Sequence, residues 1–164
     1  MKNKPTLVSA FSILFTLIIT SIFSLSSCDK EKTSNCKDKN LTCSVSGSSF
    51  QSCVITVAPA STYTWIQAQQ EDGKGSIHLY LPKDTGTYAL GGVSGYSGQY
   101  WEGSILKITS YTTDTSHTGT VSISKYDAAN KVMSGAFNFD AKQLQPAGTG
   151  TKSVTSGSFT YVKW

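Results

Sequence analysis

Beyond residue 40 the chain carries two histidines and seven acidic residues that could act as acids, bases or metal ligands. His78 alternates with Ile77 and Leu79, so we expect it on the outer face of a strand. His117 and most of the acids fall in turn-forming segments, where carboxylates accept local backbone N–H groups. The sequence contains neither the Gly-x-Ser-x-Gly of a nucleophile elbow nor the Cys-x-x-Cys of a zinc site. We therefore predict no catalytic residue, no metal site, no cofactor and no enzymatic activity.

Cysteines offer a second kind of chemistry. Cys43 and Cys53 flank the turn-forming segment 46–49, and a hairpin turn centred on Ser48 would place the two opposite each other. We predict a disulfide between them. The alternatives, that Cys36 pairs instead or that these cysteines stay reduced, remain open.

Aromatic residues could supply a binding surface. The segment from Gly91 to Gly103 is the most glycine-rich stretch of the chain, and we interpret it as a loop that carries Tyr96, Tyr100 and Trp101. Such side chains offer flat apolar faces with polar edges, which stack on sugars or anchor a protein partner. The interpretation that we favour is the more ordinary one, that one or two of them cap the end of the core, and a surface cluster is the alternative.

The N-terminal residues predict export and lipidation. A charged start precedes an apolar stretch from residue 7 to residue 23, as in a secretory signal peptide. The following Leu-Ser-Ser-Cys28 resembles the bacterial lipobox, in which the cysteine is acylated, with palmitate for example, and becomes the new N-terminus. We predict a signal peptide at 1–27 and a lipid anchor at Cys28. This places the protein in the bacterial cell envelope, at the outer membrane, on its periplasmic face or on the cell surface.

Residues 28–40 follow as a charged, flexible tether, because they combine lysines and acids with no aliphatic or aromatic side chain that could be buried. The remaining domain, 41–164, carries eight lysines against seven acids and shows no basic stripe. We therefore expect no nucleic-acid partner.

Apolar residues recur with period two from Leu41 onward, between turns rich in Gly or Asp, which predicts an all-β domain. Met133, Gly135, Phe137 and Phe139 share a parity and should face one core. The expected strands are 41–46, 53–58, 62–70, 76–81, 85–90, 104–113, 120–126, 131–141 and 153–163. These eight to nine antiparallel strands could close as a β-sandwich or as a lipocalin-like up-and-down barrel. We slightly prefer the sandwich.

Three runs resemble a family of small lipoproteins of Bacteroidetes-type bacteria. They are Gly-Thr-Val-Ser-Ile-Ser-Lys-Tyr-Asp at 119–127, Ser-Gly-Ala-Phe-Asn-Phe at 134–139 and Gly-Ser-Phe at 157–159, with Thr-Gly-Thr-Tyr-Ala-Leu-Gly upstream at 85–91. The resemblance implies a β-rich domain of unknown function and carries over no catalytic residue.

Together these features favour a membrane-anchored, non-enzymatic β domain that binds a glycan or an envelope protein or serves a structural role. The alternative is a lipocalin-like carrier of a small apolar ligand, which would need a closed barrel with an apolar cavity.

Overall fold

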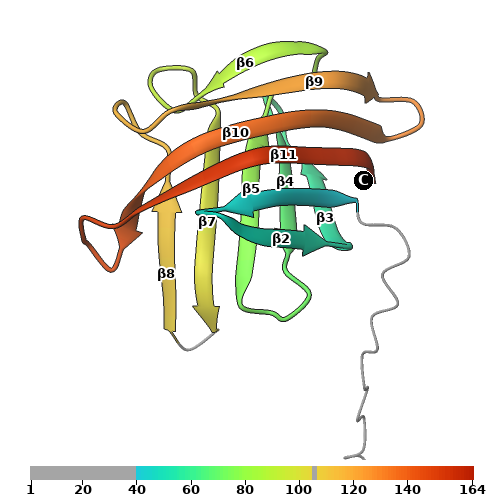
Figure 1. Cartoon of the computed structure of the whole chain (residues 1–164). Helices are drawn as coiled ribbons and strands as arrows, with labels where there is room; N and C mark the ends of the chain where they lie inside the picture. Colours follow the sequence, from blue (N-terminus) through green and yellow to red (C-terminus); the bar gives the residue numbers. More distant parts are fainter. Residues whose placement is uncertain (1–39, 105–106) are drawn as a thin grey trace, which may run out of the picture. The chain divides into compact units, whose positions relative to one another are not determined.

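The computed structural model describes residues 40–104 and 107–164, which form eleven β-strands paired only antiparallel (Figure 1). The strands are β1 (Leu41–Val45), β2 (Ser48–Ser52), β3 (Val54–Pro59), β4 (Thr64–Gln69), β5 (Gly75–Leu81), β6 (Gly86–Leu90), β7 (Ser97–Ser104), β8 (Lys107–Thr112), β9 (Gly119–Asp127), β10 (Val132–Gln145) and β11 (Thr151–Lys163). In this part of the chain no helix is long and apolar enough to cross a membrane. The predicted signal peptide and Cys28 lie outside the described residues. The predicted all-β class is confirmed.

The strands form two layers that cross at a steep angle (Figure 1). One layer contains β6, β9, β10, β11, β1 and β2, and the other contains β8, β7, β5, β4 and β3. Crossed layers of this kind are joined where strands bend from one layer into the other. Here β10 does so, because its residues 132–139 pair with β9 and its residues 142–145 pair with β8. Irregular register along β10 supplies the bends.

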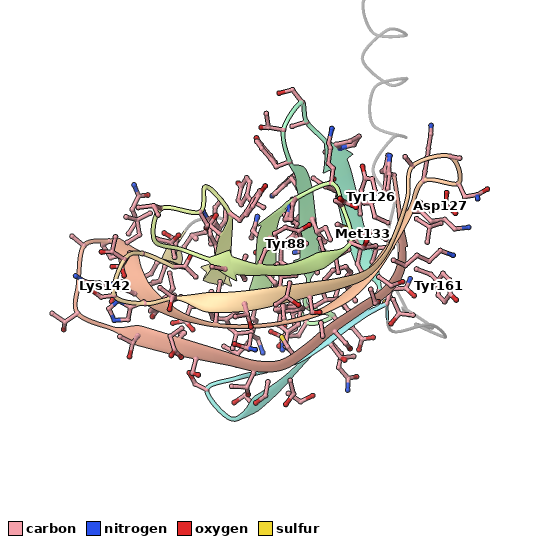
Figure 2. All side chains as sticks on the ribbon, turned by 90° about the horizontal axis from the view of Figure 1, so that it is seen from above. Tyr88, Tyr126, Asp127, Met133, Lys142 and Tyr161 are labelled. Carbon is pink, nitrogen blue, oxygen red and sulfur yellow. The ribbon has the colours of Figure 1, made fainter. Side chains whose placement is uncertain are left out.

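The sheet nearly closes on itself. Nine strands follow one another in the order β2-β1-β11-β10-β8-β7-β5-β4-β3, and only Cys53 separates the two terminal strands in the chain. The domain is thus closer to a barrel than to the separate sheets of the sandwich that we preferred. Figure 2 shows the curvature of the long strands, with Lys142 and Asp127 at opposite ends and Tyr161 pointing away from the interior.

The interior is filled by one continuous cluster of hydrophobic side chains from both layers. Met133, Phe137 and Phe139 are buried as their parity predicts. The largest fully buried hydrophobic side chains are those of Leu41, Phe50, Ile66, Ile77, Leu79, Leu81, Leu90, Val121, Met133, Val154 and Phe159. Each contributes roughly 1.5–3 kcal/mol on burial, so this cluster is the main source of stability.

The first hairpin is tighter than the sequence suggested. Ser46 and Gly47 both have positive φ, 48° and 86°, and form a two-residue turn that sets Val45 opposite Ser48. Such paired positive angles match the twist of a hairpin, and glycine adopts them without strain. β1 therefore pairs with Ser48–Ser52, and the predicted pairing of 41–46 with 53–58 is wrong.

Candidate functional site

The three aromatic residues predicted to share a loop instead point in different directions. Ser97–Ser104 is strand β7, so the side chains of Tyr100 and Trp101 project from opposite faces. Tyr100 is buried in the core, whereas Trp101 is half-buried on the outside. Tyr96 precedes the strand and packs against the core, with its ring 5.9 Å from that of Tyr88. The predicted Gly91–Gly103 loop is therefore wrong from Ser97 onward, and only Trp101 faces outward.

Trp101 belongs to an aromatic stack on the outer face of the layer that contains β4, β5 and β7. Its indole lies on His78, with ring centroids 4.2 Å apart, and Trp65 lies on the other side of His78 at 6.0 Å. The indole N–H of Trp101 donates to Gln99 Oε1 at 3.2 Å. These contacts hold the Trp101 ring in one orientation.

His78 projects outward as predicted, yet it is only 2% exposed because the indoles cover it. Its Nε2 lies 2.9 Å from Ser76 Oγ. Burial disfavours the charged imidazolium and lowers the pKa of His78 from 6.5 to about 4. His78 is therefore neutral at ordinary pH and serves as a support for Trp101.

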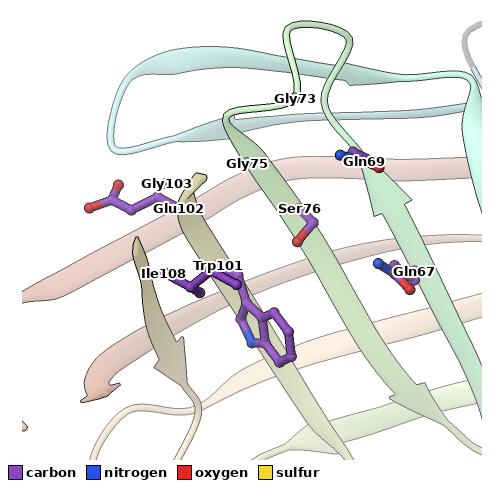
Figure 3. A pocket seen from close by; sticks show the side chains of 9 residues that line it. All are labelled: Gln67, Gln69, Gly73, Gly75, Ser76, Trp101, Glu102, Gly103 and Ile108. Carbon is purple, nitrogen blue, oxygen red and sulfur yellow. The ribbon is translucent and has the colours of Figure 1, made fainter. Parts of the chain in front are cut away.

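Beside the stack lies a groove of about 420 Å³, the outer groove, which Figure 3 shows. It is lined by Gln67, Gln69, Gly73, Gly75, Ser76, Trp101, Glu102, Gly103 and Ile108. Register places Gln69, Ser76 and Trp101 in one row across β4, β5 and β7, and exposed Val54 continues that row on β3. The groove thus runs across the strands.

Two glutamines in the outer groove have uncommitted side chains. In the described part of the chain, the amides of Gln67 and Gln69 make no side-chain hydrogen bond. Each amide carries both donors and an acceptor. They are available to a ligand.

A second polar cluster joins β7, β8 and β11. Lys152 Nζ lies 2.7 Å from Glu102 Oε2, and the Tyr111 hydroxyl donates to Glu102 Oε1 at 3.0 Å. The Lys152 ammonium also lies over the rings of Tyr100 and Tyr111, at 5.8 and 5.3 Å from their centroids. Burial, with the charge of Glu102 adding to it, raises the pKa of Tyr100 to about 12. This cluster is satisfied internally and ties β7 and β8 to β11.

His117 has a local role. Its backbone N–H donates to Asp114 Oδ1 at 2.6 Å, and its Nδ1 lies 3.0 Å from the same oxygen. The hydrogen bond with the His117 side chain, helped by backbone N–H groups, lowers the pKa of Asp114. The two histidines thus have separate partners. In residues 40–104 and 107–164 no three His, Cys, Asp or Glu side chains gather where they could hold a metal ion.

The predicted pairing of Cys43 with Cys53 is wrong. Cys43 is a buried free thiol that faces the core opposite Phe50, because the tight turn shifts the register. Cys53 lies beyond the end of β2 and is disulfide-bonded, but not to Cys43. The alternative that involves Cys36 lies outside the described residues.

The family described as Domain of unknown function (DUF6252) matches residues 41–163, which is most of the chain. The chain belongs to this family. The DUF6252 match begins at the first residue of β1 and ends at the last residue of β11, so it covers the whole strand assembly. The resemblance to a family of unknown function is thereby confirmed, while its Bacteroidetes-type source and lipoprotein nature stay predictions.

Comparison with curated proteins gave no match, and neither did comparison with solved structures. The outer groove of this DUF6252 domain therefore has to be interpreted from its own residues. Sequence reasoning found Trp101 but missed Gln67, Gln69 and Ser76. Their outward parity on two predicted strands was a usable signal, but nothing in the sequence indicated that β7 would lie beside β5.

Proposed function

We propose that the protein is a lipid-anchored, non-enzymatic binding domain of the bacterial cell envelope, and that the outer groove is its binding site. The anchor rests on the sequence Leu-Ser-Ser-Cys28 and the apolar stretch before it. The binding role rests on one observation: the Trp101 ring is held in place and lines the same groove as two glutamine amides without internal partners. A few convergent polar groups around an aromatic surface are typical of ligand sites.

Rigid support favours binding over a purely structural role for Trp101. Ordering a large side chain on association costs free energy, and a ring already fixed by His78 and Gln99 avoids most of that cost. The volume of the outer groove, about 420 Å³, lies in the range of small-ligand sites.

The alternative of a lipocalin-like carrier has less support. A carrier needs an apolar cavity within the barrel, whereas the described interior is occupied by a continuous cluster that includes Phe50, Phe137 and Phe159. We retain the outer groove as the site.

The anchor is tested by Cys28→Ala in cells. We expect loss of radiolabelled palmitate incorporation and of membrane association, and unchanged labelling would contradict the anchor.

The binding site is tested by placing a photo-reactive amino acid at Ile108, which is 43% exposed on the groove rim. We expect cross-linked products in cells from Ile108 and fewer when Trp101→Ala is added. Tyr161, 60% exposed on the other layer, is the control position. Equal products from both positions, or none from Ile108, would contradict the site.

A further inference from the structure

We propose that the outer groove binds a neutral saccharide chain, with the Trp101 ring as the stacking surface and Gln67 and Gln69 as partners of the sugar hydroxyls. This inference rests on the proposed function and names the ligand class of the same site.

The stacking surface is the first argument. One face of the Trp101 indole stacks on His78, so the opposite face is the one left for a ligand. The same side chain lines the outer groove (Figure 3). The face of an aromatic ring carries negative potential. The C–H groups on one face of a pyranose ring are weakly positive and apolar, so they pack well on such a surface. A flat, open platform suits a sugar ring better than it suits a branched apolar side chain, which needs an enclosing pocket.

Hydrogen-bonding capacity is the second argument. A sugar hydroxyl both donates and accepts, and so does a primary amide. Gln67 and Gln69 lie two positions apart on β4, so both side chains project from the same face of that strand. Their amides have no internal partner in the part of the chain that the structure describes. Two uncommitted amides that share the groove with the Trp101 indole can bond the hydroxyls of a sugar chain that extends from the stacked ring across β5.

Charge is the third argument. Among the residues that line the outer groove, Glu102 alone carries a charged side chain. Its carboxylate Oε2 lies 2.7 Å from Lys152 Nζ, which neutralises it. The lining therefore carries no uncompensated charge that would select an ionic ligand. None of the lining residues is a cation, and the lysines next to them in the chain, Lys74 and Lys107, line a neighbouring pocket. An acidic polysaccharide or a phosphate needs such a cation within its site, whereas a neutral sugar requires none.

The geometry of the row sets a minimum ligand length. Gln69 and Trp101 lie two strands apart, on β4 and β7 with β5 between them. Neighbouring strands are about 4.8 Å apart, which makes the span roughly 10 Å, the length of a disaccharide. We expect oligosaccharides to bind more tightly than the single sugars.

The experiment uses the full chain, purified in a detergent without a sugar headgroup. It is applied to a glycan array and then titrated, with tryptophan fluorescence as readout, with cello-, malto-, xylo- and chitotetraose. We expect at least one neutral glycan to bind, with a Kd that changes less than twofold between about 50 and 500 mM NaCl, because no exposed ion pair is involved.

Variants assign the binding to the groove. Trp101→Ala should weaken binding at least tenfold, and Gln67→Ala and Gln69→Ala each about threefold to tenfold, as expected for the loss of one hydrogen bond. Tyr161→Ala removes an exposed aromatic ring from the other layer and should leave the Kd unchanged. Since Trp101→Ala uncovers His78 and could disturb folding, the two glutamine variants keep the assignment testable.

Three results would overturn the saccharide assignment: no neutral glycan bound, binding that collapses with salt, or binding unaffected by both glutamine variants. Failure here is distinct from failure of the proposed function. If Ile108 still cross-links in cells in a Trp101-dependent manner while no glycan binds, the groove is a binding site for another class of partner, and only the saccharide inference is wrong.

Discussion

Protonation of His78 should destabilise the fold. Its pKa is lowered from 6.5 to about 4, because the indoles of Trp65 and Trp101 exclude water from the imidazole. The unfolded chain therefore binds more protons than the folded protein between about pH 6.5 and pH 4. The stability that comes from a neutral His78 is fully present above pH 6.5 and is lost as the pH falls through this window.

The expected loss of stability follows from the pKa shift of His78 and from the aromatic rings around its imidazole. At about 1.4 kcal/mol per pH unit, a pKa that falls from 6.5 to about 4 corresponds to roughly 3 kcal/mol. Trp101, at 4.2 Å, would attract an imidazolium through a cation–π contact of roughly 0.5–2 kcal/mol, which opposes part of the loss. We expect a net loss of about 1.5–3 kcal/mol.

The assay is urea unfolding of the wild type and His78→Phe at half-unit steps from pH 7.5 to pH 3.5. Phenylalanine keeps a flat ring under Trp101 but does not titrate. The carboxylates that titrate near pH 4 are common to both proteins, so the difference between the two curves isolates His78. The wild type should lose stability relative to His78→Phe as the pH falls from 6.5 to 4. If the stabilities of the two proteins changed in parallel over this pH range, His78 would not be the group that destabilises the fold.

Three further perturbations test the rest of the fold. Lys152→Met removes the partner of Glu102. Because both side chains are partly exposed, we expect a loss of stability of only about 1–2 kcal/mol, measured by thermal melting. A loss below about 0.3 kcal/mol would show that the cluster does not stabilise the contact of β7 and β8 with β11. Gly98→Ala would place a Cβ 2.6 Å from Phe139 Cδ1, so we expect about 1–3 kcal/mol of destabilisation in urea unfolding. An unchanged unfolding midpoint would contradict this packing. Burial raises the pKa of the Cys43 thiol to about 12, so iodoacetamide at pH 8 should label this cysteine only in denaturant. Labelling is detected by mass spectrometry, and rapid labelling of the folded protein would contradict the buried position of Cys43.

Local signals predicted the individual strands well. Glu71–Gly75 separates two alternating runs, and the structure confirms the hairpin of β4 and β5 around it. The segment 127–130 likewise joins β9 and β10 in register. Turn chemistry and period-two patterns act within a few residues, so a single sequence contains them.

Two errors fell in segments rich in glycine and serine. Several small residues at 46–49 could centre the first turn, and a shift of the turn from Ser48 to Ser46–Gly47 put Cys43 opposite Phe50 and away from Cys53. The glycines of segment 91–103 indicated a loop, yet Gly98 lies in strand β7, where the Phe139 ring occupies the space that a side chain would need. That contact joins two distant segments and has no local signal.

The candidate site was beyond sequence reasoning for a topological reason. β6 follows β5 in the chain but pairs with β9 in the other layer, which leaves β7 to pair with β5. This non-local exchange brings Trp101 beside Ser76 and onto His78. The parity of each strand could be predicted, but not the neighbour that completes the outer groove.

Hydroxyl-radical footprinting can show whether a ligand occupies the outer groove in the cell envelope. The full-length protein is oxidised in isolated envelopes and again after purification, and modification of Trp101 and Tyr161 is measured by mass spectrometry. We expect Trp101 to be protected severalfold in envelopes, while Tyr161, on the other layer, reacts equally in both samples. Equal oxidation of Trp101 in the two samples would contradict the proposed binding site.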